Sequence, residues 1–256
     1  MQPDPITVAI DGPSGSGKSS VSRAVARELG IGYLDTGAMY RALAWYCLDT
    51  GVDLGDQEAV ATAARDLPLR MTTDPDDTTT RVGGTDVTEQ IRQTRISEKV
   101  SAVATNLDVR AELRRRQREI IADARRQLGG VVAEGRDITT VVAPDAEHRI
   151  LVTASEEARL SRRARELHGG AEAEHVAATR DQVVRRDRDD STVSAFMDAA
   201  DGVVTLDTSD LTLQETVGAV LGLVRGEARS AAPHPALTDP DGAPAPIPDT
   251  DHEERA

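Results

Sequence analysis

The sequence predicts an α/β protein whose core is a five-stranded parallel sheet with helices on both faces. Short apolar runs rich in β-branched residues alternate with longer segments of helical apolar period, at the start of the chain and again after its middle. A segment rich in glycine and serine follows the first apolar run directly, where a strand would turn into a helix. The alternation is interrupted between these two parts, which predicts an inserted subdomain.

The first 51 residues predict two strand–helix pairs. Residues 6–10 (ITVAI) are typical of a fully buried strand. In the helix that follows, Val21, Val25 and Leu29 fall on one face and Gly30 provides a stop signal. The second pair is a strand at residues 32–35 and a helix at residues 38–51.

The middle of the chain, residues 51–129, is predicted to form the inserted subdomain. Residues 69–88 alternate and turn like a small antiparallel hairpin. Residues 108–130 predict a long amphipathic helix. The apolar stripe expected on this helix consists of Val109, Leu113, Ile120, Ala124 and Leu128.

The alternation then returns and completes the predicted core, which consists of residues 1–50 and 130–227. The expected strands lie at residues 130–135, 149–154 and 202–209, and the expected helices at residues 155–170 and 211–226. Residues 228–256 are rich in Pro, Ala and Asp, with few side chains able to join a core. This composition predicts a disordered acidic tail.

Composition and charge exclude several classes of protein. The 256 residues carry a formal net charge of −14, and an acidic surface repels nucleic acid and anionic membranes, so neither is expected as a partner. Cys47 is the single cysteine, which excludes an intramolecular disulfide. No apolar run approaches the roughly 18 residues of a membrane span, and the N-terminus has no signal-peptide pattern. We therefore expect a soluble, cytoplasmic protein. A monomer is a separate expectation, which these observations do not establish.

Residues Gly12–Ser19 (GPSGSGKS) match the P-loop pattern G-x-x-x-x-G-K-[ST] at every fixed position. Glycines let backbone N–H groups converge on phosphate oxygens, and the following helix adds its positive end. Lys18 would place a charge on the β- and γ-phosphates, and the Ser19 hydroxyl would help to hold Mg²⁺. A Gly/Ser turn that contains a lysine by chance would not explain the order of strand, loop and helix. The predicted ATP-binding residues are Gly12, Pro13, Ser14, Gly15, Ser16, Gly17, Lys18, Ser19 and Ser20.

Two other kinds of P-loop protein are disfavoured. A GTPase needs a D-x-x-G motif after a strand and an N/T-K-x-D base reader, but the single D-x-x-G is Asp239–Gly242 in the proline-rich tail. A mechanical ATPase needs a strand that ends in aspartate, whereas residues 131–135 (VVAEG) end in Glu-Gly. Phosphoryl transfer to a small acceptor is therefore favoured.

A site for a second phosphate is predicted at residues 34–41 (LDTGAMYR), where Thr36, a glycine turn, Tyr40 and Arg41 follow a strand. Arginine is suited to bidentate recognition of phosphate. Arg136 and Asp137 follow the strand at residues 130–135, at the edge where open α/β sheets bind their ligands.

Together with the P-loop, these motifs resemble the bacterial cytidylate kinases, nucleoside monophosphate kinases that make CDP from CMP and ATP. The resemblance runs from Ile6 to about Gly226 and includes the segments RRDRDDST and DTSDLT. It implies a P-loop kinase core, an NMP-binding insert at residues 51–129 and a short lid at about residues 158–192. It also implies ATP and Mg²⁺ as cofactors, and CMP and dCMP as substrates.

The resemblance further implies roles for individual residues. Those implied for CMP are Thr36, Tyr40, Arg41 and Arg136 at the phosphate, Ser101, Arg110 and Asp137 at the base, and Arg186 and Asp190 at the ribose. At the transferred phosphoryl group, which needs positive charge, we predict Lys18 of the P-loop together with Arg162 and Arg163 of the lid. The chemistry of cytosine agrees, because its 4-amino donor beside the N3 acceptor suits one carboxylate and one guanidinium.

Other interpretations stay open at this stage. The arginines at positions 114, 115, 116 and 118 are expected on a solvated helix face, paired with Glu112 and Glu119. The arginines between residues 159 and 165 could likewise pair with glutamates of their own helix. Val193 stands where the lid motif of the family has an arginine. The functional alternatives are a kinase for another acceptor, such as UMP or shikimate, and a nucleotide-binding regulatory module without turnover.

Overall fold

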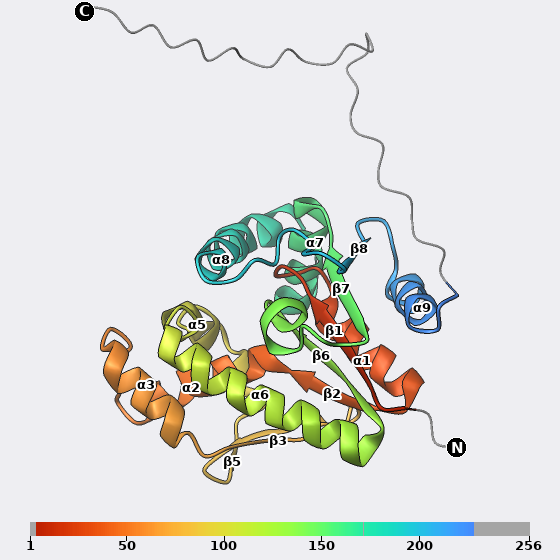
Figure 1. Cartoon of the computed structure of the whole chain (residues 1–256). Coiled ribbons are helices and arrows are strands. Elements are labelled where there is room, and N and C mark those ends of the chain that lie inside the picture. The colour runs from red at the N-terminus through yellow and green to blue at the C-terminus, as the bar shows by residue number, and fades with distance from the viewer. Residues whose placement is uncertain (1–3, 171, 228–256) are drawn as a thin grey trace, which may run out of the picture.

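The computed structural model describes residues 4–170 and 172–227, and the predicted tail lies outside these residues. Its main sheet has the strand order β2-β6-β1-β7-β8, and every neighbouring pair of strands is parallel. The strands are β1 (Ile6–Asp11), β2 (Gly32–Asp35), β6 (Gly130–Gly135), β7 (His148–Thr153) and β8 (Val204–Asp207) (Figure 1). The predicted five-stranded parallel sheet is confirmed.

Helices cover both faces of this sheet because successive strand residues point to opposite sides. In β1, Val8 and Ile10 join a core cluster with α1 (Lys18–Leu29) and α9 (Leu213–Val224). Ala9, between them, belongs to the cluster on the other face, with α2 (Thr36–Asp49) and α6 (Leu107–Leu128). The strands of a sheet buried on both faces read as continuous apolar runs, as the sequence shows.

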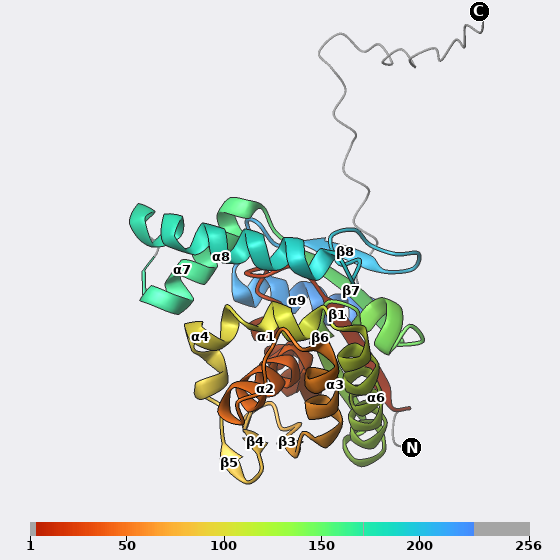
Figure 2. The same cartoon turned by 90° about the vertical axis from the view of Figure 1, so that its left-hand side faces the viewer.

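The predicted insert continues the second of these clusters. It contains α3 (Gln57–Asp66), η1 (Gln90–Arg92), α4 (Thr94–Ser97) and α5 (Val100–Ala104), whose buried side chains pack with those of α2 (Figure 2). The expected hairpin is a small antiparallel sheet of β3 (Leu69–Met71), β4 (Thr80–Val82) and β5 (Thr85–Asp86). Gly83 and Gly84, with φ of 57° and 88°, form the turn between β4 and β5. That residues 51–129 act as a separate subdomain stays a prediction.

Helix α6 buries a different stripe from the one predicted. Val109, Leu113 and Ala124 are buried as expected, but Leu128 is 44 % exposed, so its prediction was wrong. Leu128 packs on Gly32 of β2, which is an edge strand of the sheet, so no further strand of the described residues lies beside it to cover the Leu128 side chain. Two polar residues, Arg110 and Gln117, are buried on this helix.

Two helices form the region predicted as a lid. They are α7 (Glu156–His168) and α8 (Ala173–Ser191), which lie side by side above the P-loop end of the sheet in both views (Figures 1 and 2). Between β6 and β7 lies the short helical turn η2 (Ile138–Val142), held by Asp11 at the end of β1. The Asp11 carboxylate accepts hydrogen bonds from the backbone N–H groups of Ile138 and Thr139, at 3.0 and 2.8 Å. Within the described residues, no helix combines the length and apolar character needed to cross a membrane.

Candidate active site

The P-loop connects β1 to α1 in the strand–loop–helix order that its motif requires. Gly15 and Gly17 have φ of 77° and 88°, a region that residues with a Cβ rarely adopt. A Cβ on Gly12 would lie 2.3 Å from the Val152 carbonyl oxygen. Glycine is therefore required at these positions by backbone geometry and by close packing, and the N-terminus of α1 opens onto the loop.

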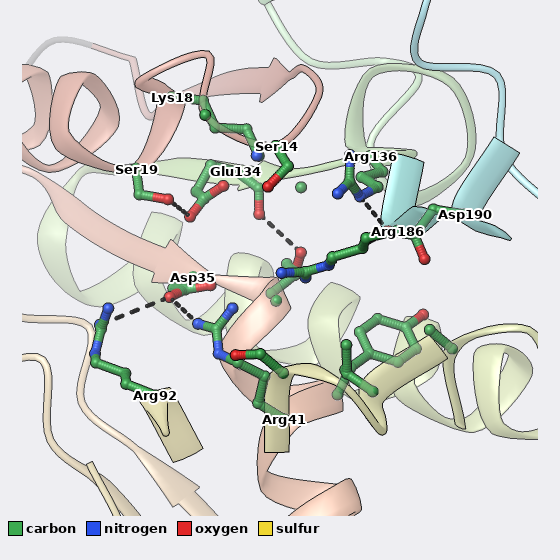
Figure 3. A pocket seen from close by; sticks show the side chains of 18 of the residues that line it. Ser14, Lys18, Ser19, Asp35, Arg41, Arg92, Glu134, Arg136, Arg186 and Asp190 are labelled. Carbon is green, nitrogen blue, oxygen red and sulfur yellow. Dashed lines mark hydrogen bonds and ion pairs between the residues drawn. The ribbon is translucent and has the colours of Figure 1, made fainter. Parts of the chain in front are cut away.

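A cavity of about 590 Å³ lies beside this loop, between the lid helices and the insert (Figure 3). Its charge is opposite to that of the whole chain, which carries a formal net charge of −14. Eight basic side chains line the cavity: Lys18, Arg23, Arg41, Arg92, Arg110, Arg136, Arg163 and Arg186. Four acidic side chains line it: Asp35, Glu89, Glu134 and Asp190. A cavity with this excess of positive charge, in an acidic protein, is suited to anionic ligands.

Lys18 is partly buried and lines the cavity. Its Nζ donates a hydrogen bond to the Pro13 carbonyl oxygen at 3.2 Å. Burial lowers the pKa of Lys18 to about 8; the nearby Glu134 carboxylate opposes this shift, whereas the positive charges of Arg136 and Arg186 reinforce it. An anion bound at Lys18 would therefore stabilise the charged form of this side chain, because the protein alone balances the charge only in part.

Glu134, at the end of β6, is a site residue that the sequence reasoning did not assign. The Ser19 hydroxyl donates a hydrogen bond to its Oε1 at 2.6 Å (Figure 3). Burial and the neighbouring Asp35 carboxylate raise the pKa of Glu134. Its position carried a usable signal, because β6 is parallel to β1 and Glu134 therefore ends its strand beside the start of the P-loop.

A second charged group lies at the end of β2, where Asp35 is paired in register with Glu134 of β6. Asp35 caps α2 by accepting a hydrogen bond from the Ala38 N–H at 2.8 Å, and it accepts another from Arg41 at 2.8 Å. Arg92 of η1 lies 4.0 Å from the same carboxylate (Figure 3). Burial alone would raise the pKa of Asp35, but the charges of Arg41 and Arg92 outweigh burial and hold it below its usual value.

Arg136 lies between the P-loop and α8. Its Nε is 2.5 Å from Asp190 Oδ2, and its Nη1 is 3.1 Å from Asp187 Oδ1. The guanidinium stacks on the Phe196 ring, with its carbon 4.4 Å from the ring centroid. Arg186 is partly buried beside it, and this desolvation, together with the charge of Arg136, lowers the pKa of Arg186 to about 10.

Behind this wall, Asp137 is held by two arginines of α6. Arg110 Nη2 is 2.8 Å from Asp137 Oδ2, and Arg114 Nε and Nη2 are 3.0 and 2.9 Å from the same oxygen. Arg110 also donates to the Ala104 carbonyl oxygen at 3.0 Å and to the Ser194 hydroxyl at 2.6 Å. Arg114, expected on a solvated face, is therefore part of a buried ionic group.

The structure brings most of the predicted site residues to the cavity, and those on its wall are Ser14, Gly15, Gly17, Lys18, Ser19, Ser20, Thr36, Tyr40, Arg41, Arg110, Arg136, Arg163, Arg186 and Asp190. Gly12, Pro13 and Ser16 belong to the P-loop but do not line the wall, and neither do Ser101 and Asp137.

Arg162 also lies off the wall, behind the loop. It donates to the Ser16 carbonyl oxygen at 3.1 Å and to the Thr208 hydroxyl at 3.0 Å, so it ties the P-loop to the end of β8.

The family model for cytidylate kinase matches residues 8–226 of this chain. The chain belongs to the cytidylate kinase family. A curated cytidylate kinase from Streptomyces griseus subsp. griseus is 46 % identical over 223 residues, covering 87 % of this chain and 94 % of the relative. One from Cutibacterium acnes is 46 % identical and covers 88 % of this chain and 98 % of the relative. Among solved structures, TT1252 from Thermus thermophilus covers 89 % of this chain and 100 % of that chain, with 19 % identity and a TM-score of 0.43.

The family match runs from Val8, within β1, to beyond the end of α9, and includes the P-loop and helices α7 and α8. As a member of this family, the chain is a phosphotransferase. The excess of positive charge in its cavity suits a reaction between phosphate groups.

Proposed function

We propose that the chain transfers the γ-phosphoryl group of ATP to the phosphate of CMP or dCMP, giving ADP and CDP or dCDP. The observation that carries the proposal is the cavity itself. It has an ATP loop at one end, and Arg41, Arg110 and Arg136, from three different segments, on its remaining walls. A site for two anionic nucleotides needs this arrangement, because both bring phosphate charge to one place.

At the ATP end, the N–H groups of Gly12–Ser20 and the N-terminus of α1 bind the phosphates, with Lys18 on the β- and γ-phosphates. The oxygen donors at Ser19 and Glu134 fit Mg²⁺, which prefers oxygen ligands and keeps several waters. Ser19 would bind the ion directly, and Glu134 would accept hydrogen bonds from its waters. When bound, Mg²⁺ neutralises charge on the β- and γ-phosphate oxygens.

At the acceptor end, Arg41 and Arg136 bind the CMP phosphate, with Thr36 and Tyr40 beside it. Each of these arginines is already held by a carboxylate, Arg41 by Asp35 and Arg136 by Asp190. Their orientation is therefore set before the substrate arrives, which reduces the entropy lost on binding.

The base is read next to α6 and η2. Arg110 on the wall donates to the N3 side of cytosine, and Asp137 accepts from the 4-amino group. The hydrogen bonds that the described residues make to Asp137 all reach Oδ2. Oδ1 is therefore the oxygen assigned to the substrate. Uracil, with an O4 acceptor and an N3 donor, would leave both protein groups mismatched.

Catalysis then consists of alignment and charge neutralisation, because the transition state of phosphoryl transfer is loose. Lys18 and Arg163 stabilise charge on the transferred group, while Arg41 and Arg136 aim the CMP oxygen in line with it. The same proposal keeps the predicted roles of the remaining residues. These are Arg162 at the phosphoryl group, Ser101 at the base, and Arg186 and Asp190 at the ribose. The lid helices exclude water, which would otherwise accept the phosphoryl group.

A panel of acceptors tests this proposal. The chain is assayed with Mg²⁺-ATP and CMP, dCMP, UMP, AMP or shikimate, and product nucleotides are separated by chromatography. We expect CMP and dCMP to have the highest kcat/KM, with UMP lower by at least about tenfold, or 1.4 kcal/mol. A higher kcat/KM for UMP, AMP or shikimate would contradict the assignment of the acceptor. No turnover with any acceptor, while ATP still binds, would favour the regulatory alternative.

A further inference from the structure

A buried carboxylate of α8, Asp187, connects three segments that the proposed reaction uses. Its Oδ1 accepts a hydrogen bond from the Ser14 N–H of the P-loop at 3.0 Å. The same oxygen lies 3.1 Å from Arg136 Nη1, and Oδ2 accepts a hydrogen bond from Arg159 of α7. The side chains of Asp187, Arg159 and Arg136 are 8 %, 9 % and 13 % exposed, so these contacts form away from bulk water.

Arg159 fixes the other side of the same contact. Its Nη1 donates to the Ser14 carbonyl oxygen at 2.9 Å, so that Arg159 and Asp187 together bind both backbone groups of Ser14. Gly15 packs so closely on Arg159 that an added Cβ would lie 2.5 Å from its carbonyl oxygen. The P-loop is thereby held against both lid helices by a buried ion pair.

Among the described residues, the other contacts of Arg136 fix its orientation relative to the P-loop only weakly. Its short ionic contact to Asp190 and its stacking on Phe196 bind it to the lid segment, and its contact to the Gly12 carbonyl oxygen is long, at 3.5 Å. Asp187 is the group that touches Arg136 and the loop through one oxygen atom.

We propose that Asp187 is a positioning residue for phosphoryl transfer, which sets Arg136 at a fixed place relative to the ATP loop. This inference rests on the proposed function, in which Arg136 aims the acceptor phosphate at the γ-phosphate held by the loop. Small misplacement of an aiming group lowers the rate strongly, because reacting atoms must be held in near-attack geometry. Asp187 thus acts on turnover rather than on the binding of either nucleotide.

The test is Asp187→Asn, which keeps the shape of the side chain and an oxygen that can accept from Ser14, but removes the charge between Arg136 and Arg159. We expect kcat to fall by about tenfold to a hundredfold, with KM for ATP and for the acceptor changed less than about threefold. Asp189→Asn is the matched control, because Asp189 lies on the same helix and contacts Arg188 at 3.7 Å. It should keep wild-type kcat.

A double-mutant cycle identifies the partner. If Asp187 acts through Arg136, Asp187→Asn in an Arg136→Met background should lower kcat by less than about twofold further. Multiplicative losses in the double variant, or an unchanged kcat in the single variant, would overturn the inference. If Asp187→Asn melts below the assay temperature, Asp187→Glu keeps the charge but displaces it, and an unchanged kcat there would also overturn the inference.

The cycle is run with the acceptor that gives the highest wild-type kcat/KM in the panel. Preference for an acceptor other than CMP would then count against the proposed function alone, whereas additivity between positions 136 and 187 counts against the role of Asp187 alone. If no acceptor is turned over, the same double-mutant cycle is measured by the rate of ATP hydrolysis. Additive effects of the two substitutions on that rate would again contradict the role of Asp187.

Discussion

The ATP end and the acceptor end of the cavity place their charges by different means. The ATP end is one continuous segment, Gly12–Ser20, whose conformation comes from glycine backbone geometry and the start of a helix. The acceptor end is assembled from side chains of α2, η1, α6, α8 and the end of β6, each held by an ion pair. The first should therefore depend on few side chains, and the second should be sensitive to each of several.

Lys18 is one of the few side chains on which the ATP end should depend. Lys18→Ala should lower kcat by at least about a hundredfold to a thousandfold with the fold intact, because the charge acts where charge develops in the transition state. Steady-state rates and thermal unfolding are measured together. Lys99→Ala, at the exposed lysine outside the cavity, is the matched control. Near-wild-type turnover in Lys18→Ala would contradict the P-loop assignment.

The strongest single effect at the acceptor end is expected at Asp137. Asp137→Ala should lower kcat/KM for CMP by about tenfold to a hundredfold, or 1.4–3 kcal/mol, because the 4-amino group of the bound cytosine loses its hydrogen-bond acceptor. The loss for UMP should be smaller, since the carboxylate no longer repels the uracil O4. Measuring kcat/KM for both substrates in both proteins decides between two roles. Equal losses would mean that Asp137 only holds Arg110 and Arg114.

The ATP end should also respond to pH in a way that the acceptor end does not. The pKa of Lys18 is lowered to about 8 by burial, so the free protein loses this charge as the pH rises through 8, while bound phosphate favours the charged form. We expect proton uptake on ATP binding above about pH 8, and an ATP dissociation constant that rises up to about tenfold from pH 7 to 9.

Calorimetry in buffers of different ionisation enthalpy measures this uptake directly. Lys18→Met should bind ATP more weakly and without the uptake. The same proton uptake in the wild type and in Lys18→Met would assign it to another group.

The smallest predicted effect on kcat/KM distinguishes Arg114 from its neighbour on α6, Arg115. Arg114→Leu removes two contacts to Asp137 Oδ2 and should lower kcat/KM for CMP by about threefold to tenfold, whereas Arg115→Leu should change it by less than twofold. Arg115 is 55 % exposed and pairs with glutamates of its own helix, which makes it a matched control. Recovery of activity in Arg114→Lys would support an ionic role. Equal effects at the two positions would contradict it.

The sheet and the P-loop could be predicted from sequence because their signals are local. Apolar runs mark the strands, and the P-loop motif lies within eight consecutive residues, Gly12–Ser19. Of the proposed acceptor residues, Arg41 and Arg136 were indicated by the strands that they follow, whereas Arg110 could be predicted only through the resemblance to a family. The three are far apart along the chain, and the fold brings them together.

The residues that sequence reasoning missed are those whose partners lie on other elements. Arg159 has a glutamate at helical spacing, Glu156, and Arg114 belongs to an arginine-rich run that also contains glutamates, so a solvated face was predicted for both. Their partners are Asp137, in the segment after β6, and Asp187, on a neighbouring helix. Arg162 was expected at the transferred group; its guanidinium lies off the cavity wall and donates to the carbonyl oxygens of Ser16 and Leu211, so its role at the phosphoryl group stays a prediction.

The contrast between the charge of the cavity and that of the whole chain bears on how a nucleotide reaches the protein. At long range, a chain with a net charge of −14 repels a polyanion, whereas the basic wall attracts it only over short distances. Salt screens the distant repulsion first, because the Debye length is about 10 Å at 0.1 M ionic strength and the cavity charges are partly buried. Encounter with ATP should therefore be fastest at moderate ionic strength rather than in the most dilute buffer, the reverse of the salt dependence of an enzyme that is basic overall.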